Sequence, residues 1–191
     1  NAFPCLIIYP ATLKENWRRE WQIWTGRRAL VMEPHMKMSW HRYHERGLAS
    51  VFIVNYESLK KYFVRDMPEK MKDKKSDDVT FLDGVGMFKS VIIDEAHRCK
   101  NYRTLQAKLT KGICREKEYV LALTGTPVVN KPEDLASQLA IIGQLAPFTG
   151  WRTFHDMFCT DPPLRGAHAW LNAQLRRHCF YRREKHEVLT Q

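Results

Sequence analysis

The chain has 191 residues, a hydrophobic content of 44% and a formal net charge of +10 at pH 7. This length suits one good-sized domain with a hydrophobic core, and the basic balance suits a polyanionic partner, nucleic acid first, although a basic protein without such a partner stays open. No apolar run approaches a membrane span, and five cysteines without a Cys-x-x-Cys pair indicate reduced thiols in a cytosolic or nuclear setting.

The first elements are a strand and a helix. Residues 4–10 form an apolar run that predicts a buried strand stopped by a proline. Thr12 suits the N-cap of a helix, Glu15 completes a capping box, and Gly26 ends the helical pattern. We expect this helix to lie on a sheet through a stripe of apolar residues at helical spacing: Leu13, Trp17, Trp21 and Trp24.

Two further strands are predicted at residues 29–32 and 50–56. The stretch 35–47 between them favours a short helix. It holds three histidines but no cysteine or carboxylate that completes a metal site at sensible spacing. Residues 68–78 mix lysine and aspartate with no apolar period, which predicts a solvated, mobile loop.

The most informative stretch is Ser-Val-Ile-Ile-Asp-Glu-Ala-His at residues 90–97. The β-branched run predicts a strand buried on both faces, so Asp94 and Glu95 are expected at its carboxyl end, where ligands bind in open α/β sheets. One carboxylate there can hold Mg²⁺ through water and the other can accept a proton. A solvated acidic turn is the alternative, and a metal-dependent nuclease needs further carboxylates that the sequence does not offer.

Another strand and two helices follow. Thr104 suits the N-cap of a helix with Leu105 and Leu109 inward, and residues 119–123 predict another buried strand. Asn130 suits the N-cap of the next helix, with Pro132 in its first turn. Its predicted apolar face and its end comprise Leu135, Leu139, Ile142 and Gly143.

The remaining chain is aromatic and then basic. Residues 147–166 are predicted to be irregular, and residues 171–185 combine apolar positions with arginine and lysine. His155 and Cys159 stand one helical turn apart, with His178 and Cys179 later. Adjacent His-Cys ligands suit zinc poorly, so structural roles are preferred.

Several motifs carry a family resemblance. Asp-Glu-Ala-His at 94–97 and Thr-Gly-Thr-Pro at 124–127 resemble the Walker B motif and motif III of superfamily II helicase-like ATPases. Residues 6–24 resemble motif Ia of the Swi/Snf branch, residues 55–57 resemble motif Ib, and residues 175–189 resemble the segment that ends the first lobe in that branch. The resemblance covers residues 4–189 in the family's motif order.

The resemblance implies an α/β fold, namely a three-layer RecA-like, mostly parallel sheet of the P-loop NTPase type with helices on both faces. Residues 1–146 would form a partial ATP-binding lobe, and residues 147–191 a helical, basic extension. It further implies a DNA-stimulated ATPase that moves on double-stranded DNA inside the cell, in the cytoplasm or nucleoid of a prokaryote or virus, or in a nucleus.

The resemblance also assigns roles. Asp94 orders Mg²⁺ through water, Glu95 orients and deprotonates the attacking water of ATP hydrolysis, and His97 relays the state of the γ-phosphate. Coupling to DNA falls to Thr124, Gly125 and Thr126. Contacts to DNA phosphates are expected from Thr12, Lys14, Tyr56, Arg98 and Lys100, although packing is an equally good interpretation of Tyr56.

One family element is missing. The 191 residues contain no Gly-Lys pair, so no phosphate-binding Walker A loop. We therefore expect an internal piece of a longer polypeptide whose Walker A segment and second RecA-like lobe lie elsewhere. Its sheet lacks the P-loop strand, and alone it is marginally stable and inactive. A catalytically inactive, basic nucleic-acid-binding α/β module is the alternative.

Overall fold

The computed structural model describes residues 1–71, 74–128, 131–160 and 164–182. The chain divides into two compact units, Asn1–Gly143 and Gln144–Gln191, where the sequence analysis placed the boundary after residue 146. Each unit is described by itself.

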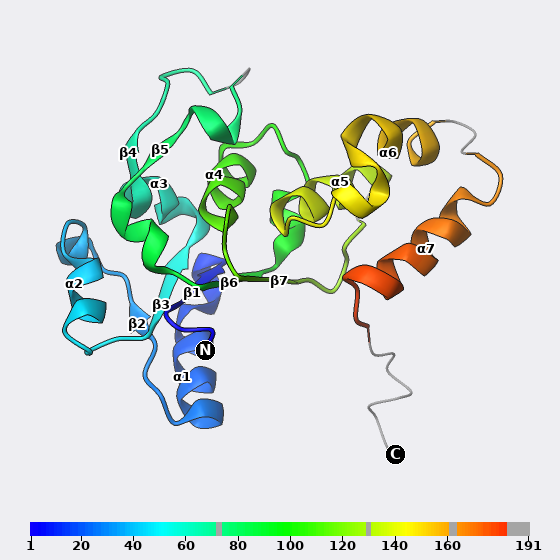
Figure 1. The fold of residues 1–191 in the computed structure, drawn as a ribbon. Helices are drawn as coiled ribbons and strands as arrows, with labels where there is room; N and C mark the ends of the chain where they lie inside the picture. The colour runs from blue at the N-terminus through cyan, green and yellow to red at the C-terminus, as the bar shows by residue number, and fades with distance from the viewer. Residues whose placement is uncertain (72–73, 129–130, 161–163, 183–191) are drawn as a thin grey trace, which may run out of the picture. The chain divides into compact units, whose positions relative to one another are not determined.

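The first unit is built on a five-stranded sheet with the order β2-β3-β1-β6-β7 (Figure 1). Every neighbouring pair is parallel, so the carboxyl ends of all five strands meet at one edge. This confirms the predicted α/β class with a mostly parallel sheet. The strands are β1 (Cys5–Tyr9), β2 (Leu30–Val31), β3 (Val51–Asn55), β6 (Ser90–Asp94) and β7 (Tyr119–Leu123).

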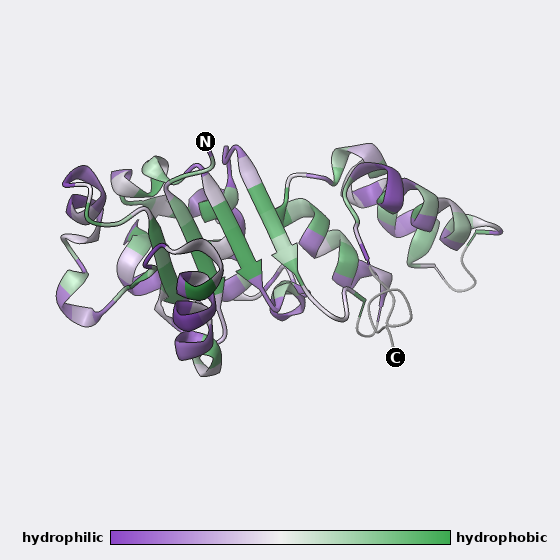
Figure 2. Cartoon of the chain, turned by 90° about the horizontal axis from the view of Figure 1, so that it is seen from below, coloured by the Kyte–Doolittle hydropathy of each residue, from purple (hydrophilic) through white to green (hydrophobic). Residues whose placement is uncertain are grey.

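Both faces of the sheet are apolar, because the central strands do not alternate with polar residues (Figure 2). In β1, Leu6 and Ile8 belong to the larger core cluster, which includes residues of α2 (Trp40–Glu45), α3 (Leu59–Phe63) and α4 (Leu105–Cys114). Ile7 belongs to the smaller cluster on the other face, against which α1 (Lys14–Thr25) packs. Helices therefore cover both faces, as predicted.

Helix α1 differs from its prediction at both ends. Thr12 lies in a 3₁₀ turn, Ala11–Leu13, and makes no cap hydrogen bond to α1, so the predicted capping box is wrong. Trp17 and Trp21 pack against the smaller cluster, but Trp24 is 81% exposed and donates to Glu20 instead. Gly26 ends the helix as predicted, in the left-handed conformation with φ 67°.

Strand β7 is also less buried than expected. Within the described residues it is an edge strand of the sheet, paired with β6. Tyr119, Leu121 and Leu123 are 41–51% exposed, so the prediction of burial on both faces is wrong for this strand. An apolar run alone does not say whether both faces of a strand are covered.

The segment after α3 holds a small second sheet that the sequence analysis missed. β4 (Val64–Asp66) and β5 (Thr80–Phe81) pair antiparallel around the stretch expected to be a solvated loop. Ser76 in this stretch is only 5% exposed, so part of it packs on the unit.

The later helices of the first unit follow the predicted caps in part. Thr104 accepts a hydrogen bond from the Ala107 amide at the start of α4, as predicted, but Leu105 is exposed. Helix α5 (Pro132–Ile141) has Pro132 in its first turn and packs beside α4. The predicted N-cap, Asn130, lies outside the described residues.

The second unit contains α6 (Gly150–Phe158) and α7 (Ala167–His178). Phe148, Phe154 and Phe158 are buried, and the Phe158 ring stacks on Trp170 with centroids 5.8 Å apart. The prediction of irregular structure over 147–166 is therefore wrong for residues 150–158, where the aromatic residues stand at helical spacing. The basic run after residue 182 lies outside the described residues.

Seven short 3₁₀ helices complete the described secondary structure: Ala11–Leu13, Pro34–Met36, Tyr56–Ser58, Ser76–Asp78, Asp83–Met87, Ala96–Cys99 and Ala146–Phe148. Among the described helices, none is long and apolar enough to cross a membrane.

Candidate active site at the carboxyl edge of the sheet

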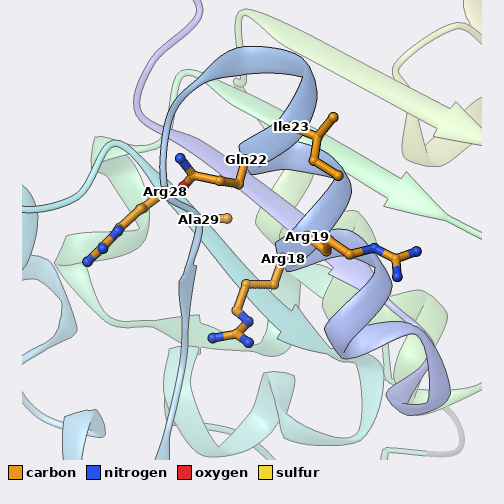
Figure 3. A pocket seen from close by; sticks show the side chains of 6 residues that line it. All are labelled: Arg18, Arg19, Gln22, Ile23, Arg28 and Ala29. Carbon is orange, nitrogen blue, oxygen red and sulfur yellow. The ribbon is translucent and has the colours of Figure 1, made fainter.

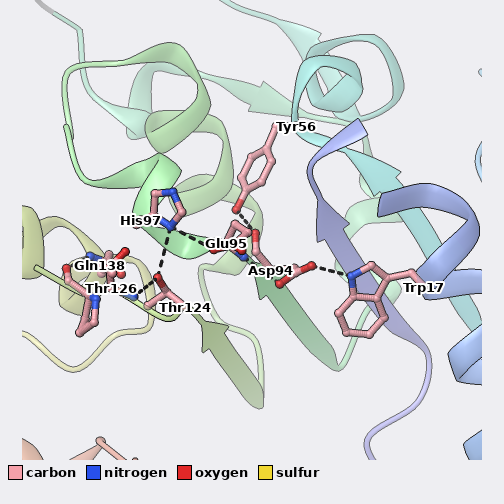
Figure 4. Close-up of polar contacts among 9 residues, drawn as sticks. Trp17, Tyr56, Asp94, Glu95, His97, Thr124, Thr126 and Gln138 are labelled. Carbon is pink, nitrogen blue, oxygen red and sulfur yellow. Dashed lines mark hydrogen bonds and ion pairs between the residues drawn. The ribbon is translucent and has the colours of Figure 1, made fainter. Parts of the chain in front are cut away.

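Asp94 ends strand β6, and both of its carboxylate oxygens have a hydrogen-bond donor (Figure 4). Oδ1 accepts from the Glu95 backbone N–H at 2.9 Å, and Oδ2 accepts from Trp17 Nε1 at 2.6 Å. No Lys or Arg of the described chain forms an ion pair with this carboxylate. The Asp94 carboxylate is therefore held in one orientation, but its negative charge is not neutralised.

Glu95 follows in a left-handed backbone conformation, with φ 49° and ψ 50°. This conformation is uncommon for a residue with a side chain, and such residues cluster at functional sites. It turns the chain sharply from β6 into the 3₁₀ helix Ala96–Cys99. The Glu95 side chain is 41% exposed, so a ligand at this edge can reach its carboxylate.

His97 joins Glu95 to the loop after β7. Its Nδ1 lies 3.1 Å from Glu95 Oε2 and 3.3 Å from Thr124 Oγ1. Thr124 Oγ1 in turn accepts the Thr126 amide at 3.2 Å, and Gln138 of α5 donates to the Pro127 carbonyl at 2.5 Å. The structure thus connects the two motifs, which follow the neighbouring strands β6 and β7.

The third predicted coupling residue, Gly125, lies between these two threonines. A Cβ added to it would meet nothing within 4 Å. The loop after β7 is therefore open on this side.

Tyr56 lies beneath the site. Its side chain is 2% exposed, and its hydroxyl donates to the Asp94 backbone carbonyl at 2.7 Å. Burial raises the pKa of the Tyr56 phenol far above its ordinary value, which keeps the hydroxyl protonated as a donor. Of the two interpretations of Tyr56, this burial favours packing, and contact to DNA stays a prediction.

The other predicted phosphate contacts differ in exposure. Thr12 is exposed in the turn after β1, and Lys14 and Lys100 are partly exposed near the same edge. Arg98 forms an ion pair with Glu57 at 2.8 Å and lies over the Tyr56 ring, 5.2 Å from its centroid. The Arg98 side chain is 33% exposed, so its guanidinium is only partly available to a further anion.

Buried hydrogen bonds hold the 3₁₀ helix that follows Glu95. The Cys99 thiol donates to Thr110 of α4 at 3.7 Å, and Ser137 of α5 donates to the Cys99 carbonyl at 2.6 Å. Burial raises the pKa of Cys99 to about 11, so the thiol stays neutral at physiological pH. Two helices thereby fix the backbone behind the acidic turn.

A hollow lies along α1 and the segment after it. It has a volume of about 530 Å³ and is lined by Arg18, Arg19, Gln22, Ile23, Arg28 and Ala29 (Figure 3). Arg18 pairs with Glu15 at 2.9 Å, Arg19 pairs with Glu20 at 3.2 Å, and the Arg19 and Arg28 side chains extend in opposite directions. These guanidiniums do not converge, so the hollow lacks the geometry of an anion site.

The carboxyl edge suits a hard cation better than a transition metal. In the described part of the chain, no group of three or more His, Cys, Asp and Glu could hold a metal ion by itself. Mg²⁺, however, is usually bound through one or two carboxylates, waters and substrate phosphates. Asp94 retains a free lone pair on each oxygen, since each accepts one hydrogen bond, so its donor set fits this mode.

Comparison with known families decides the classification. The family model of the SNF2-related domain matches residues 2–191. The chain belongs to the SNF2-related domain family. This confirms the resemblance noted in the sequence and, with it, a helicase-like ATPase domain with a RecA-like fold.

Individual relatives agree with this. Chromodomain-helicase-DNA-binding protein 6 of Mus musculus is 32% identical over 151 residues, which covers 71% of this chain and 5% of that protein. DNA annealing helicase and endonuclease ZRANB3 of Homo sapiens is 26% identical over 206 aligned positions, covering all of this chain and 17% of that protein. The chain therefore spans a small part of the length of these SNF2 relatives.

A solved structure has the same fold. The SWI2/SNF2 ATPase core of Sulfolobus solfataricus, described in complex with double-stranded DNA, superposes with a TM-score of 0.66. The match covers 95% of this chain and 34% of that one at 24% identity, which establishes the shared fold.

Trp17 contacts the candidate site but was not predicted as one of its residues. Its helical spacing predicted a place in the core, and it does pack there. A tryptophan, however, also carries an N–H that seeks a partner when partly buried. That property was the only signal in the sequence that could have pointed to Asp94.

Proposed function

We propose that this SNF2 domain belongs to the ATP-hydrolysing motor of a protein that moves along double-stranded DNA or remodels protein–DNA complexes inside the cell. The observation that supports the proposal best is the connected set Asp94, Glu95, His97 and Thr124 at the carboxyl edge of the sheet. It contains an oriented carboxylate, an accessible base and a hydrogen-bonded route to a neighbouring loop.

In the proposed reaction, Glu95 orients a water molecule and accepts its proton as the water attacks the γ-phosphorus of ATP, the bond from that phosphorus to the β–γ bridging oxygen breaks, and ADP leaves. The Glu95 side chain is 41% exposed, so its carboxylate is accessible to this water. His97, 3.1 Å from Glu95, restricts where the carboxylate can point. Asp94 would hold Mg²⁺ through water, and the cation would supply compensation for the charge of the β- and γ-phosphates.

Coupling to DNA runs, in this proposal, through His97. A change in the position of Glu95 alters its contact with His97, and His97 also contacts Thr124 in the loop with Gly125 and Thr126. These contacts support the proposal, because they join Glu95 and the loop after β7 in one hydrogen-bonded group.

Contacts to DNA are proposed for exposed or partly exposed groups at the same edge: Thr12, Lys14, Lys100 and the free portion of Arg98. Contacts of this kind read phosphates rather than base sequence, which suits movement along DNA. DNA binding should therefore weaken steeply with salt for any DNA sequence. The net charge of +10 supports the same partner.

Hydrolysis is proposed to require more than these 191 residues. They contain no Gly-Lys pair for a Walker A loop, and we propose that this loop and the second RecA-like lobe of the full-length protein complete the site. The isolated 191-residue chain should then bind DNA weakly and hydrolyse no appreciable ATP.

The test is ATP hydrolysis by the full-length protein with and without duplex DNA, beside Glu95→Gln. We expect DNA-stimulated turnover that Glu95→Gln lowers by about 100-fold to about 10,000-fold, the usual range for loss of a positioned general base. Glu69→Gln, the same change at an exposed position between β4 and β5, is the matched control and should leave turnover unchanged.

Two outcomes would contradict the proposal. Equal loss in both variants would show that Glu95 has no special role. Salt-sensitive DNA binding without any ATP turnover in the full-length protein would support the alternative, a catalytically inactive nucleic-acid-binding module.

A further inference from the structure

Trp17 connects helix α1 to the acidic strand end. Its indole Nε1 donates to Asp94 Oδ2 at 2.6 Å, although the two residues are 77 positions apart in the sequence (Figure 4). The ring itself packs against the smaller core cluster on the sheet face beneath α1. One side chain thus anchors the helix to the sheet and supplies a donor to the site.

Trp21, one turn further along α1, separates these two roles. It is also partly buried and packs against the same cluster. Its Nε1, however, is buried without any hydrogen-bond partner. Packing on this face therefore does not require a partner for the indole N–H, and the bond of Trp17 is a feature beyond packing.

We propose that Trp17 is a positioning residue for the Mg²⁺ site, holding the Asp94 carboxylate in the orientation that receives the hydrated cation. This inference rests on the function proposed above and adds a residue to it. Trp17 acts through Asp94 and touches neither nucleotide nor cation.

The chemistry of the donor supports this role. A lysine or arginine at the same place would orient the carboxylate but also neutralise it, which would weaken its attraction for a divalent cation. An indole N–H is a neutral donor, so Asp94 keeps its full charge. With the Glu95 amide on Oδ1, the carboxylate is held at both oxygens, and each oxygen retains a lone pair that faces no donor in the described structure.

The location of the donor has a second consequence. Trp17 lies on α1, which begins at Lys14 and follows the turn that holds Thr12. Thr12 and Lys14 are two of the residues proposed to contact DNA. A shift of α1 on binding DNA would therefore also move the donor on Asp94. This gives the site a short route to the DNA-contacting helix that does not pass through His97.

The test compares Trp17→Phe with Trp21→Phe in the full-length protein. Both remove the same atoms from the same helix face, but only the first removes a donor from Asp94. The readouts are the Mg²⁺ concentration that half-activates ATP hydrolysis and the affinity for Mn²⁺ in the presence of ATPγS, measured by the loss of the free Mn²⁺ electron paramagnetic resonance signal.

We expect Trp17→Phe to raise the half-activating Mg²⁺ concentration and to weaken Mn²⁺ binding by about tenfold, the usual scale for loss of a partner that orients a metal ligand. Trp21→Phe should leave both within about twofold. If Trp17→Phe fails to fold, 3-benzothienylalanine at position 17, which keeps the shape of the indole but lacks the N–H, replaces it and should give the same shift.

The outcomes separate the two proposals. If the unmodified full-length protein hydrolyses ATP and Trp17→Phe and Trp21→Phe show the same metal dependence, the role of Trp17 is overturned and the ATPase proposal stands. Absence of ATP turnover, with Mn²⁺ binding weakened only by the change at position 17, overturns the ATPase proposal and supports the positioning role.

Discussion

Tyr56→Phe tests which role this residue has, since the sequence alone allowed both packing and contact to DNA. The substitution removes one oxygen atom and keeps the ring. That oxygen donates to the Asp94 carbonyl at 2.7 Å, a short and favourable distance, in a side chain that is 2% exposed. A neutral buried hydrogen bond contributes about 1 kcal/mol, and a carbonyl left without its donor costs about 1–3 kcal/mol.

We therefore expect Tyr56→Phe to lower the free energy of unfolding by about 1–2 kcal/mol. Urea unfolding of the 191-residue chain, followed by far-ultraviolet circular dichroism, measures this change. Tyr62→Phe is the matched control, because Tyr62 is also buried and donates to a backbone carbonyl, that of Met32, at 3.1 Å. It should cost a similar amount.

The same variants in the full-length protein separate packing from contact to DNA. If Tyr56 packs, duplex binding and its salt dependence match those of Tyr62→Phe, while ATP turnover falls only in Tyr56→Phe because Asp94 loses support. A Tyr56→Phe protein of unchanged stability and distinctly weaker DNA binding would refute the reasoning from burial.

Two further predictions concern the core. Gly112→Ala in α4 places a Cβ 2.4 Å from the Phe81 ring, so overpacking of about 1–3 kcal/mol outweighs a helix-propensity gain of about 1 kcal/mol. Urea unfolding should show that Gly112→Ala lowers the free energy of unfolding in the unmodified chain and raises it when Phe81→Ala is already present. A rise in both backgrounds would contradict the predicted clash. Burial raises the pKa of Cys99 in the folded chain to about 11. Above about pH 9 the thiol therefore loses its proton in the unfolded chain but keeps it in the folded chain, so the free energy of unfolding should fall between about pH 9 and about pH 11. Burial also raises the pKa of Cys5 and Cys114, so Cys99→Ala should reduce this slope without abolishing it in unfolding measured against pH. An unchanged slope would contradict a contribution from Cys99.

The strands were the most predictable part of the fold. The apolar runs at residues 5–9, 51–54 and 91–93 contain no charged residue, which is typical of strands in a sheet covered on both faces. Parallel pairing then brings the carboxyl ends to one edge, so Asp94 and Thr124 could be expected near each other. Their connection through His97 depends on local geometry that the sequence does not specify.

Helical spacing predicted the side of the helix that a residue occupies better than it predicted whether that residue is buried. Trp17, Trp21 and Trp24 all follow the same stripe, yet only the first two reach the apolar cluster of the sheet. Spacing states which side of a helix a residue occupies. It does not state where along the helix the partner surface ends, and Trp24 lies in the last turn.

Strand β7 shows the same limit in a sheet. Its sequence is as apolar as that of β1, but Leu121 is 51% exposed while Ile7 is fully buried. The strand register puts Ile7, Ile92 and Leu121 on the same face of the sheet. The smaller cluster under α1 includes Ile7 and Ile92 but does not extend to Leu121. Burial of a strand is decided by elements that are distant in sequence, and a single run of residues cannot report them.

The contacts that define the site have the same origin. The bond from Trp17 to Asp94 joins residues whose separate patterns, an amphipathic helix and a buried strand, are each complete without it. Trp21 meets the same pattern and makes no such bond. Since pattern alone does not distinguish these two tryptophans, their comparison in metal binding separates the contribution of the fold from that of the site.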